Sequence, residues 1–166
     1  AARRAAEALG YRVLDLGAFV EGETRAVATA VAGVVRSIRT DGAPVAPPAC
    51  VLIGGETTVT LGDNPGKGGR NQEFVLAMLA KLGVEGMRGV TVLSGGTDGE
   101  DGPTDAAGAV ADAETLAQVP GGVVSVSEHL ASHNAYPLLD RAGALLKPGL
   151  TGTNVMDVRV VLVEKV

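Results

Sequence analysis

Aromatic residues and cysteine are scarce in this sequence. Only four of its 166 residues are aromatic, none of them tryptophan, and Cys50 is the single cysteine. Proteins that stack single-stranded bases need aromatic platforms, so this class is excluded. A lone cysteine builds neither a disulfide framework within the chain nor a thiolate cage for zinc, which excludes disulfide-stapled domains and structural zinc modules.

Long apolar runs and an excess of positive charge are missing as well. No run approaches the roughly 20 residues that a membrane-spanning helix needs, and the first residues show no signal-peptide pattern. The formal net charge is −5 and the sequence pI is about 5.0, whereas general nucleic-acid binders carry basic patches. We therefore expect a cytoplasmic protein without nucleic-acid or membrane partners.

What the sequence does contain is apolar residues and glycine. Hydrophobic residues make up 46% of the chain, which is enough for the core of one domain. Glycine occupies 24 positions, roughly twice its usual share, and indicates many tight turns. Stretches typical of strands alternate with stretches typical of helices. We therefore expect an α/β fold with three layers, α/β/α, around a mixed β-sheet with glycine-rich loops at the strand ends.

Apolar periodicity and turn residues divide the chain into segments. The expected strands are 11–16, 50–53, 57–61, 90–93 and 158–163, and the expected helices are 1–10, 23–39, 71–82, 112–118, one that starts near 125, and 136–141. The hairpin-like spacing of 50–53 and 57–61 is the reason to expect a mixed sheet. Prolines in 44–48 predict a linker between a helix-strand-helix lead-in, residues 1–43, and an α/β region, residues 49–166.

Three segments rich in Gly, Thr, Asp and Asn adjoin expected strand ends, namely 54–72, 94–108 and 149–157. Ligands of open α/β sheets bind at such ends. Gly68 and Gly69 let the backbone approach an anion, and Arg70 follows at the start of a helix, where a phosphate or carboxylate is favoured. Tight turns with a surface-paired arginine are the alternative for one loop, but three such loops favour a binding site.

The second of these segments carries four carboxylates within eight residues, namely Asp98, Glu100, Asp101 and Asp105. They repel one another unless a cation or a cluster of donors lies among them. Asp98 comes just after an expected strand and is placed to act as a general base or as a Mg²⁺ ligand. A solvated acidic turn is the alternative.

Several familiar motifs are absent. The chain has neither a G-x-x-x-x-G-K-[ST] loop nor a G-x-G-x-x-G that follows a strand, and the latter absence counts against a nicotinamide-binding fold. His129 and His133 have the i, i+4 spacing of a zinc helix, but Leu130 stands where such hydrolases need glutamate, so we expect a solvated helix face. Cys50 lies in an apolar strand and is expected to be a small core residue.

Four motifs follow one another along the chain. They are Gly54-Gly55-Glu56-Thr57-Thr58-Val59-Thr60, Gly68-Gly69-Arg70-Asn71-Gln72-Glu73, Ser94-Gly95-Gly96-Thr97-Asp98-Gly99 with Gly102-Pro103-Thr104-Asp105, and Thr151-Gly152-Thr153-Asn154-Val155-x-Asp157. In this order they resemble the MOFRL region, the C-terminal part of type-2 glycerate 2-kinases, which were long labelled hydroxypyruvate reductases. The resemblance covers residues 49–166, and residues 1–43 resemble the stretch just before that region.

The resemblance implies a two-domain kinase that uses ATP and Mg²⁺ to convert D-glycerate to 2-phosphoglycerate in a cleft between its domains. It implies a catalytic or phosphate-binding role for Arg70 and a catalytic or metal-binding role for Asp98. The residues that it implies for substrate or phosphate binding are Glu56, Gly68, Gly69, Asn71, Thr97, Asp105 and Asn154. The family's N-terminal domain, which supplies a lysine of the site, is not in this sequence, so we expect the chain alone to be inactive.

Two positions depart from the family pattern G-P-T-G-T-N-V-N-D. Leu150 replaces its proline and Met156 replaces its second asparagine; if that asparagine binds ligand, the contact is lost here. Two other functions remain open, an NAD(P)H-dependent hydroxypyruvate reductase, which lacks a dinucleotide fingerprint here, and a non-catalytic anion-binding or assembly module. The sequence also leaves open whether the chain forms a homo-oligomer.

Overall fold

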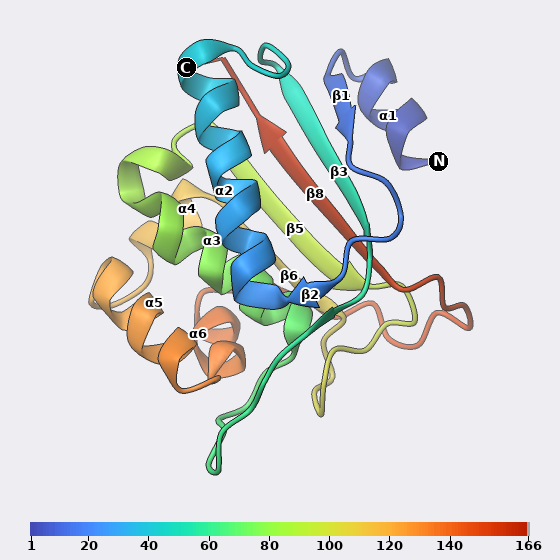
Figure 1. Cartoon of the computed structure of the whole chain (residues 1–166). Helices are drawn as coiled ribbons and strands as arrows, with labels where there is room; N and C mark the ends of the chain where they lie inside the picture. The colour runs from blue at the N-terminus through green and yellow to red at the C-terminus, as the bar shows by residue number, and fades with distance from the viewer. Residues whose placement is uncertain (166) are drawn as a thin grey trace.

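A six-stranded mixed sheet forms the centre of the computed structural model, which describes residues 1–165 (Figure 1). Its strands, in spatial order, are β1 (Arg12–Asp15), β3 (Ala49–Gly55), β8 (Asp157–Val163), β5 (Val90–Gly96), β6 (Gly108–Ala111) and β7 (Leu145–Leu146). β1 pairs with β3 in parallel, whereas the other pairings in this sheet are antiparallel. β2 (Gly22–Glu23) and β4 (Thr57–Thr58) form a separate parallel pair.

The predicted mixed sheet is confirmed, but the hairpin expected between residues 50–53 and 57–61 is wrong. β4 pairs with β2 and not with β3. The chain leaves the sheet at Gly55, where φ is +129°, and a Cβ at this position would collide with the backbone of Val20. The mixed character comes instead from the parallel β1–β3 pair beside antiparallel pairings, of which β8, between β3 and β5, makes two.

Helices cover both faces of the sheet. The described residues form α1 (Ala2–Ala8), α2 (Thr24–Asp41), α3 (Arg70–Met87), α4 (Ala113–Ala117), α5 (Gly122–Ala131) and α6 (Ala135–Arg141). α2 and α3 pack against each other on one face, and α4, α5 and α6 extend this layer (Figure 1). On the opposite face, α1 covers Cys50 and Leu52, so the predicted core position of Cys50 is confirmed. The three predicted layers are present, with α1 as a small third layer.

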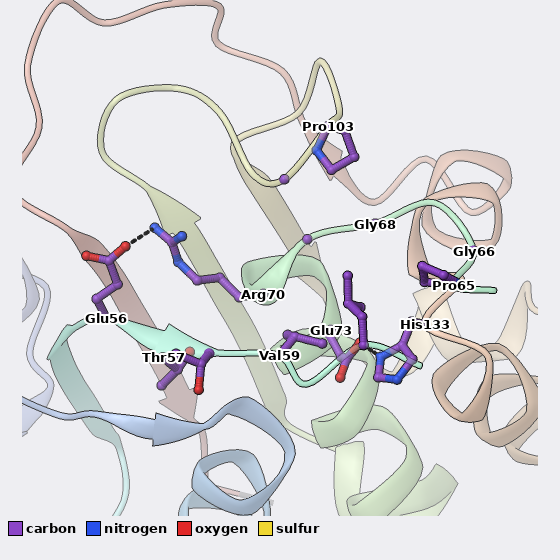
Figure 2. Close-up of a pocket in the computed structure, with 14 residues that line it drawn as sticks. Glu56, Thr57, Val59, Pro65, Gly66, Gly68, Arg70, Glu73, Pro103 and His133 are labelled. Atoms are coloured by element: carbon purple, nitrogen blue, oxygen red, sulfur yellow. Dashed lines mark hydrogen bonds and ion pairs between the residues drawn. The ribbon is translucent and has the colours of Figure 1, made fainter. Parts of the chain in front are cut away.

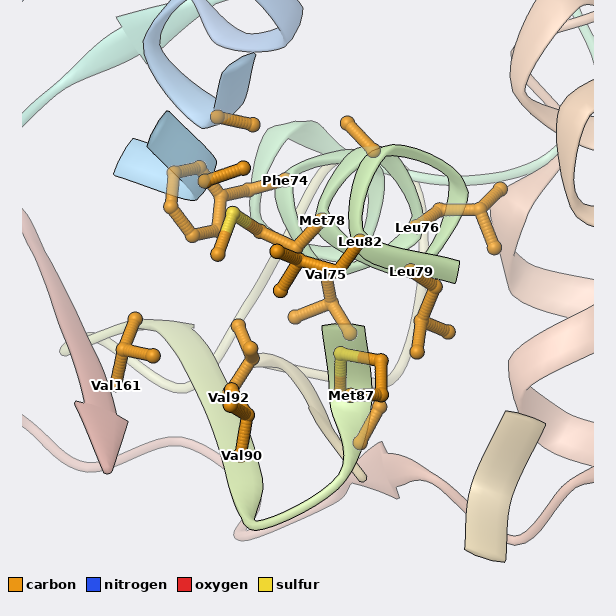
Figure 3. Packing of buried hydrophobic residues seen from close by; sticks show 14 of the residues in the cluster. Phe74, Val75, Leu76, Met78, Leu79, Leu82, Met87, Val90, Val92 and Val161 are labelled. Atoms are coloured by element: carbon orange, nitrogen blue, oxygen red, sulfur yellow. The ribbon is translucent and has the colours of Figure 1, made fainter. Parts of the chain in front are cut away.

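The main core lies between the sheet and the layer that contains α2 and α3. Phe74 and Met78 of α3 are fully buried there in one cluster with Val92 of β5 and Val161 of β8 (Figure 3). Removal of this apolar area from water is the main favourable contribution to folding. Because α3 contributes so many buried side chains, the position of its first turn is tightly determined.

Local sequence explains some of the element ends. Asp112 caps α4, since its side chain accepts from the Thr115 amide at 2.9 Å. α3 is interrupted at Gly83, where φ is +63°, next to the predicted end at residue 82. α5 begins at Gly122 rather than near 125, without a side-chain cap. The sequence does not predict β6, because glycine and alanine carry little strand signal.

Residues 1–43 and the region after the proline-rich segment share one sheet and one helical layer, through β1 on β3 and α2 on α3. None of the helices in residues 1–165 combines the length and apolar character that crossing a membrane requires.

The strand order brings three loops to one edge of the sheet. β3 and β5 run in the same direction with β8 antiparallel between them, and Gly55, Asp157 and Gly96 are neighbours in register. The C-terminal ends of β3 and β5 therefore meet the N-terminal end of β8. The glycine-rich segments 54–72 and 94–108 and the loop before β8 lie together at this edge, where α/β sheets commonly bind ligands.

Candidate functional site

Asp157, the first residue of β8, lies fully buried at this edge. Arg70 donates to both of its oxygens, from Nε to Oδ2 at 2.8 Å and from Nη2 to Oδ1 at 3.0 Å. Asn71 donates to Oδ1 through Nδ2, and Arg159 donates to Oδ2 through Nη2, each at 3.0 Å. A buried carboxylate needs such partners, and the two-point contact fixes the plane of the Arg70 guanidinium.

Arg70 begins α3 directly after the glycines, as predicted, and lines a cavity of about 470 Å³ (Figure 2). Its Nη2 also lies 3.1 Å from Oε1 of the half-exposed Glu56. The hydrogen bond to Asp157 raises the pKa of Arg70 against the opposing effect of burial. Within the described residues these contacts engage Nε and Nη2, which leaves the Nη1 edge for an incoming anion.

The start of α3 already binds an anion that belongs to the protein itself. The buried side chain of Asp101 accepts from the Asn71 amide at 3.0 Å and from the Gln72 amide at 2.9 Å. Gly69 makes this approach possible, because a Cβ there would collide with Asp101. These two helix amides are therefore not free for a phosphate, and Arg70 is the group at this helix start that can bind one.

Asn71 is drawn inward as well. Its Oδ1 accepts from Ser94 Oγ at 2.6 Å, while its Nδ2 donates to Asp157. The side chain is fully buried. Asn71 thus joins α3 to β5 and β8 behind Arg70, and the structure gives it a supporting position rather than one on the cavity wall.

The four neighbouring carboxylates do not form one cluster. Asp101 turns inward to α3, whereas Asp105 accepts from Tyr136 Oη at 2.6 Å and pairs with Lys147 at 3.3 Å. Asp101 and Asp105 thus each have their own hydrogen-bond donors, which relieve the repulsion between neighbouring carboxylates that the sequence predicted. Among residues 1–165 no three His, Cys, Asp or Glu side chains are grouped so that they could hold a metal ion.

Asp98 and Asn154 line a second hollow at the same edge. Asn154 Nδ2 donates to Asp98 Oδ2 at 3.3 Å. Thr97 holds the two loops together, since its Oγ1 donates to the Met156 carbonyl at 2.7 Å and accepts from the Val155 amide at 2.8 Å. Asp98 Oδ1 accepts from the Glu100 amide at 3.2 Å, and Asp98 lines this hollow from a loop that is tied to the start of β8.

The structure divides the predicted site residues into groups. The cavity in front of α3 is lined by Glu56, Gly68, Gly69 and Arg70. The second hollow holds Asp98 and Asn154, with Thr97 as a support. Asn71 supports the first group from behind Arg70. Asp105 lies apart from both groups, where it contacts the side chains of Tyr136 and Lys147.

Sequence reasoning missed a buried charged group at the inner end of the cavity. Glu73 Oε1 lies 2.6 Å from Arg25 Nε, and its Oε2 lies 2.9 Å from His133 Nδ1. The solvated helix face expected for His133 is wrong, because this residue follows the end of α5 and points into the cavity (Figure 2). The signal that could have revealed Glu73 was its i, i+3 spacing from Arg70, which places both residues on one face of the helix.

Met156 occupies a left-handed backbone conformation, with φ at +67°. This region costs an ordinary L-residue about 1–2 kcal/mol, and asparagine tolerates it best after glycine. The backbone alone therefore accounts for an asparagine in the family pattern at this position.

Met156→Asn is expected to raise the free energy of unfolding by about 0.5–1 kcal/mol, because the backbone strain is relieved. Urea unfolding at neutral pH measures the difference. Met156→Ala is the matched control, since alanine meets the same left-handed strain. An equal gain in both variants would assign the effect to the methionine side chain instead.

Asp101 is expected to make stability depend on pH. Burial raises the pKa of Asp101 from 3.8 to about 6, in spite of the hydrogen bonds from Asn71 and Gln72. Between these values the folded chain binds a proton that the unfolded chain has lost, so this residue's contribution to the unfolding free energy falls by about 2–3 kcal/mol as pH rises through the window.

Asp101→Asn removes the titration, so the stability of the wild type relative to this variant should decrease from about pH 4 to about pH 6 and then stay level. Urea unfolding of both proteins across this range gives the difference. Parallel pH profiles would show that Asp101 has an ordinary pKa.

Three named proteins from other organisms are similar in sequence to this chain. Glycerate 2-kinase of Pyrococcus horikoshii is 37% identical over 96% of this chain and 36% of that protein. D-glycerate 2-kinase of Thermotoga maritima is 36% identical over 98% of this chain and 38% of that protein. An Agrobacterium vitis protein, provisionally named a hydroxypyruvate reductase, is 42% identical over 98% of this chain and 42% of its own length.

A solved structure shares the fold. The crystal structure of a glycerate kinase from Thermotoga maritima matches with a TM-score of 0.89 at 35% identity, over 98% of this chain and 38% of that one. The chain thus spans about two fifths of the length of these relatives. The MOFRL family model matches residues 49–157, which include every motif that surrounds Asp157. The chain therefore belongs to the MOFRL family.

Proposed function

We propose that this chain is the C-terminal part of a glycerate 2-kinase, in which ATP phosphorylates the 2-hydroxyl of D-glycerate to give 2-phosphoglycerate. The observation that supports this most is the Asp157–Arg70 pair, a buried carboxylate that orients an arginine at the wall of a cavity. Asp98 lies on the neighbouring loop. Relatives named as glycerate 2-kinases favour the same activity.

The two charged residues have complementary tasks in this proposal. Phosphoryl transfer depends mainly on alignment and on neutralisation of phosphate charge. Arg70 binds phosphate oxygens of ATP through its free edge, and Asp98 either accepts the proton of the glycerate hydroxyl or holds Mg²⁺. The donor set fits this ion, because Mg²⁺ commonly takes one or two carboxylates and completes its shell with phosphate oxygens and water. When bound, the ion neutralises phosphate charge.

A second domain is part of the proposal. At this edge three large apolar side chains are strongly exposed, Phe19 at 87%, Leu150 at 78% and Val155 at 65%. Covering these side chains with a partner domain would remove apolar surface from water, which is favourable. We propose that an N-terminal domain covers them, supplies the lysine of the family and closes the cleft. The present 166 residues joined to that N-terminal domain are called the two-domain chain.

The two-domain chain is expected to release ADP from ATP in the presence of D-glycerate and Mg²⁺, whereas the 166-residue chain alone is expected to show no measurable turnover. With one wall of the cleft missing, the reacting oxygens stay in water, where electrostatic stabilisation is weak. A coupled ADP assay on both proteins makes the comparison. Turnover by the shorter chain within about tenfold of the longer one would show that the site is complete without the second domain.

The same two-domain chain tests the other enzyme activity. The name of the Agrobacterium vitis relative favours reduction of hydroxypyruvate. NADH oxidation with hydroxypyruvate, measured beside the kinase assay, separates the two activities. Failure of both with ATP or glycerate still bound would favour a non-catalytic anion-binding module.

Arg70→Ala in the two-domain chain is expected to lower kcat by about 10²–10³, because it removes one charge-stabilising contact. Arg88→Ala is the control, since Arg88 follows the other end of α3 and its side chain is 64% exposed. Circular dichroism checks that both variants fold. Wild-type kinetics in Arg70→Ala would remove this residue from the site.

A further inference from the structure

The cavity in front of Arg70 is larger than glycerate requires. It encloses about 470 Å³ between residues 56–61, residues 65–70 and the loop at Gly102 and Pro103 (Figure 2). Pockets that bind drug-sized ligands measure roughly 300–1,000 Å³. Each of the three carbons of glycerate carries oxygen, so glycerate has little apolar surface to bury and would leave most of this volume unfilled.

The chemistry of the wall is also unlike that of a glycerate site. Apolar side chains face the cavity from three segments, namely Val59, Leu61, Pro65 and Pro103. Charged groups are confined to the ends, with Arg70 and Glu56 at one end and Glu73 beside His133 at the other (Figure 2). The cavity therefore fits a ligand with an apolar body and an anionic end that reaches Arg70.

We propose that this cavity binds the base and ribose of the nucleotide, with the phosphates on Arg70. The assignment rests on the proposed function, because it divides the cavity and the second hollow between the two substrates of that kinase. Only the nucleotide has a flat ring whose faces gain free energy when they are buried against Val59 and Pro103. Glycerate then occupies the hollow at Asp98 and Asn154.

The inner end of the cavity offers an acceptor that is held in place. The side chain of Glu73 is only 4% exposed, and the contacts to Arg25 and His133 engage one of its oxygens each. A carboxylate has about four acceptor sites, so Glu73 keeps some for a further donor. The exocyclic amino group of adenine is such a donor, and it lies at the end of the nucleotide opposite the phosphates.

The test compares ATP with inorganic triphosphate, which has the same anionic groups but no base. Isothermal titration calorimetry on the two-domain chain, without glycerate, measures both affinities. The wild type is expected to bind ATP roughly tenfold or more tightly than triphosphate. Val59→Trp fills the cavity, so ATP should bind this variant no more tightly than triphosphate does, while the triphosphate affinity stays at the wild-type value.

Two further variants keep the test decisive. Pro103→Trp fills the cavity from another segment, and the same loss of ATP affinity is expected for it. It takes the place of Val59→Trp in the test if Val59→Trp does not fold. Val84→Trp adds the same ring at a position on α3 that is 59% exposed and lies outside the cavity lining, and it should bind both ligands as the wild type does. In steady state, the cavity variants should raise KM for ATP and leave KM for glycerate within about twofold.

Three results would overturn the assignment. They are an unchanged ATP affinity in the folded cavity variants, an equal loss for ATP and triphosphate, and a rise in KM for glycerate alone. The proposed function fails in a different way, because a wild type that binds ATP through its base but transfers no phosphoryl group refutes the kinase and leaves the nucleotide assignment standing.

Discussion

The buried carboxylate of Asp157 is the constraint on which the rest of this edge depends. A charge without access to water must be matched by donors, or it destabilises the fold by several kcal/mol. Arg70 and Arg159 both donate to it, and buried Asp101 adds a second negative charge close to them. The two arginines and two aspartates balance each other, so α3, β8 and the acidic loop are held in one arrangement.

Arg159 shows what this arrangement costs. It is fully buried, and burial lowers its pKa although Asp157 acts in the opposite direction. In the described part of the chain its Nε and Nη1 have no hydrogen-bond partner, and its guanidinium carbon lies 5.1 Å from the centre of the Phe74 ring. The ring face offers part of the missing electrostatic support. The buried guanidinium of Arg159 holds Asp157 in one orientation, and Asp157 in turn orients Arg70. This role explains why a charged group is kept in the core.

The sequence predicted the position of Arg70 at the start of a helix, that of Asp98 just after a strand, and the three glycine-rich segments at strand ends, because glycines and strand ends are local signals. It did not reveal which acid would face which donor. Asp101 looked equivalent to its neighbours until the fold placed it on the amides of α3. Glu73 and His133 come from distant segments and meet only through packing of α5 beside α3. Pairings of this kind follow from tertiary structure, which a local pattern does not encode.

The two glycine loops are fitted to each other at the atomic level. A Cβ on Gly69 would strike Asp101, and a Cβ on Gly102 would lie 2.5 Å from the carbonyl oxygen of Gly68. Neither loop can therefore change its backbone path or gain side chains alone. In a chimera between family members, segments 66–72 and 98–104 would have to be transferred as one unit, and during divergence the two segments are expected to have changed together or not at all.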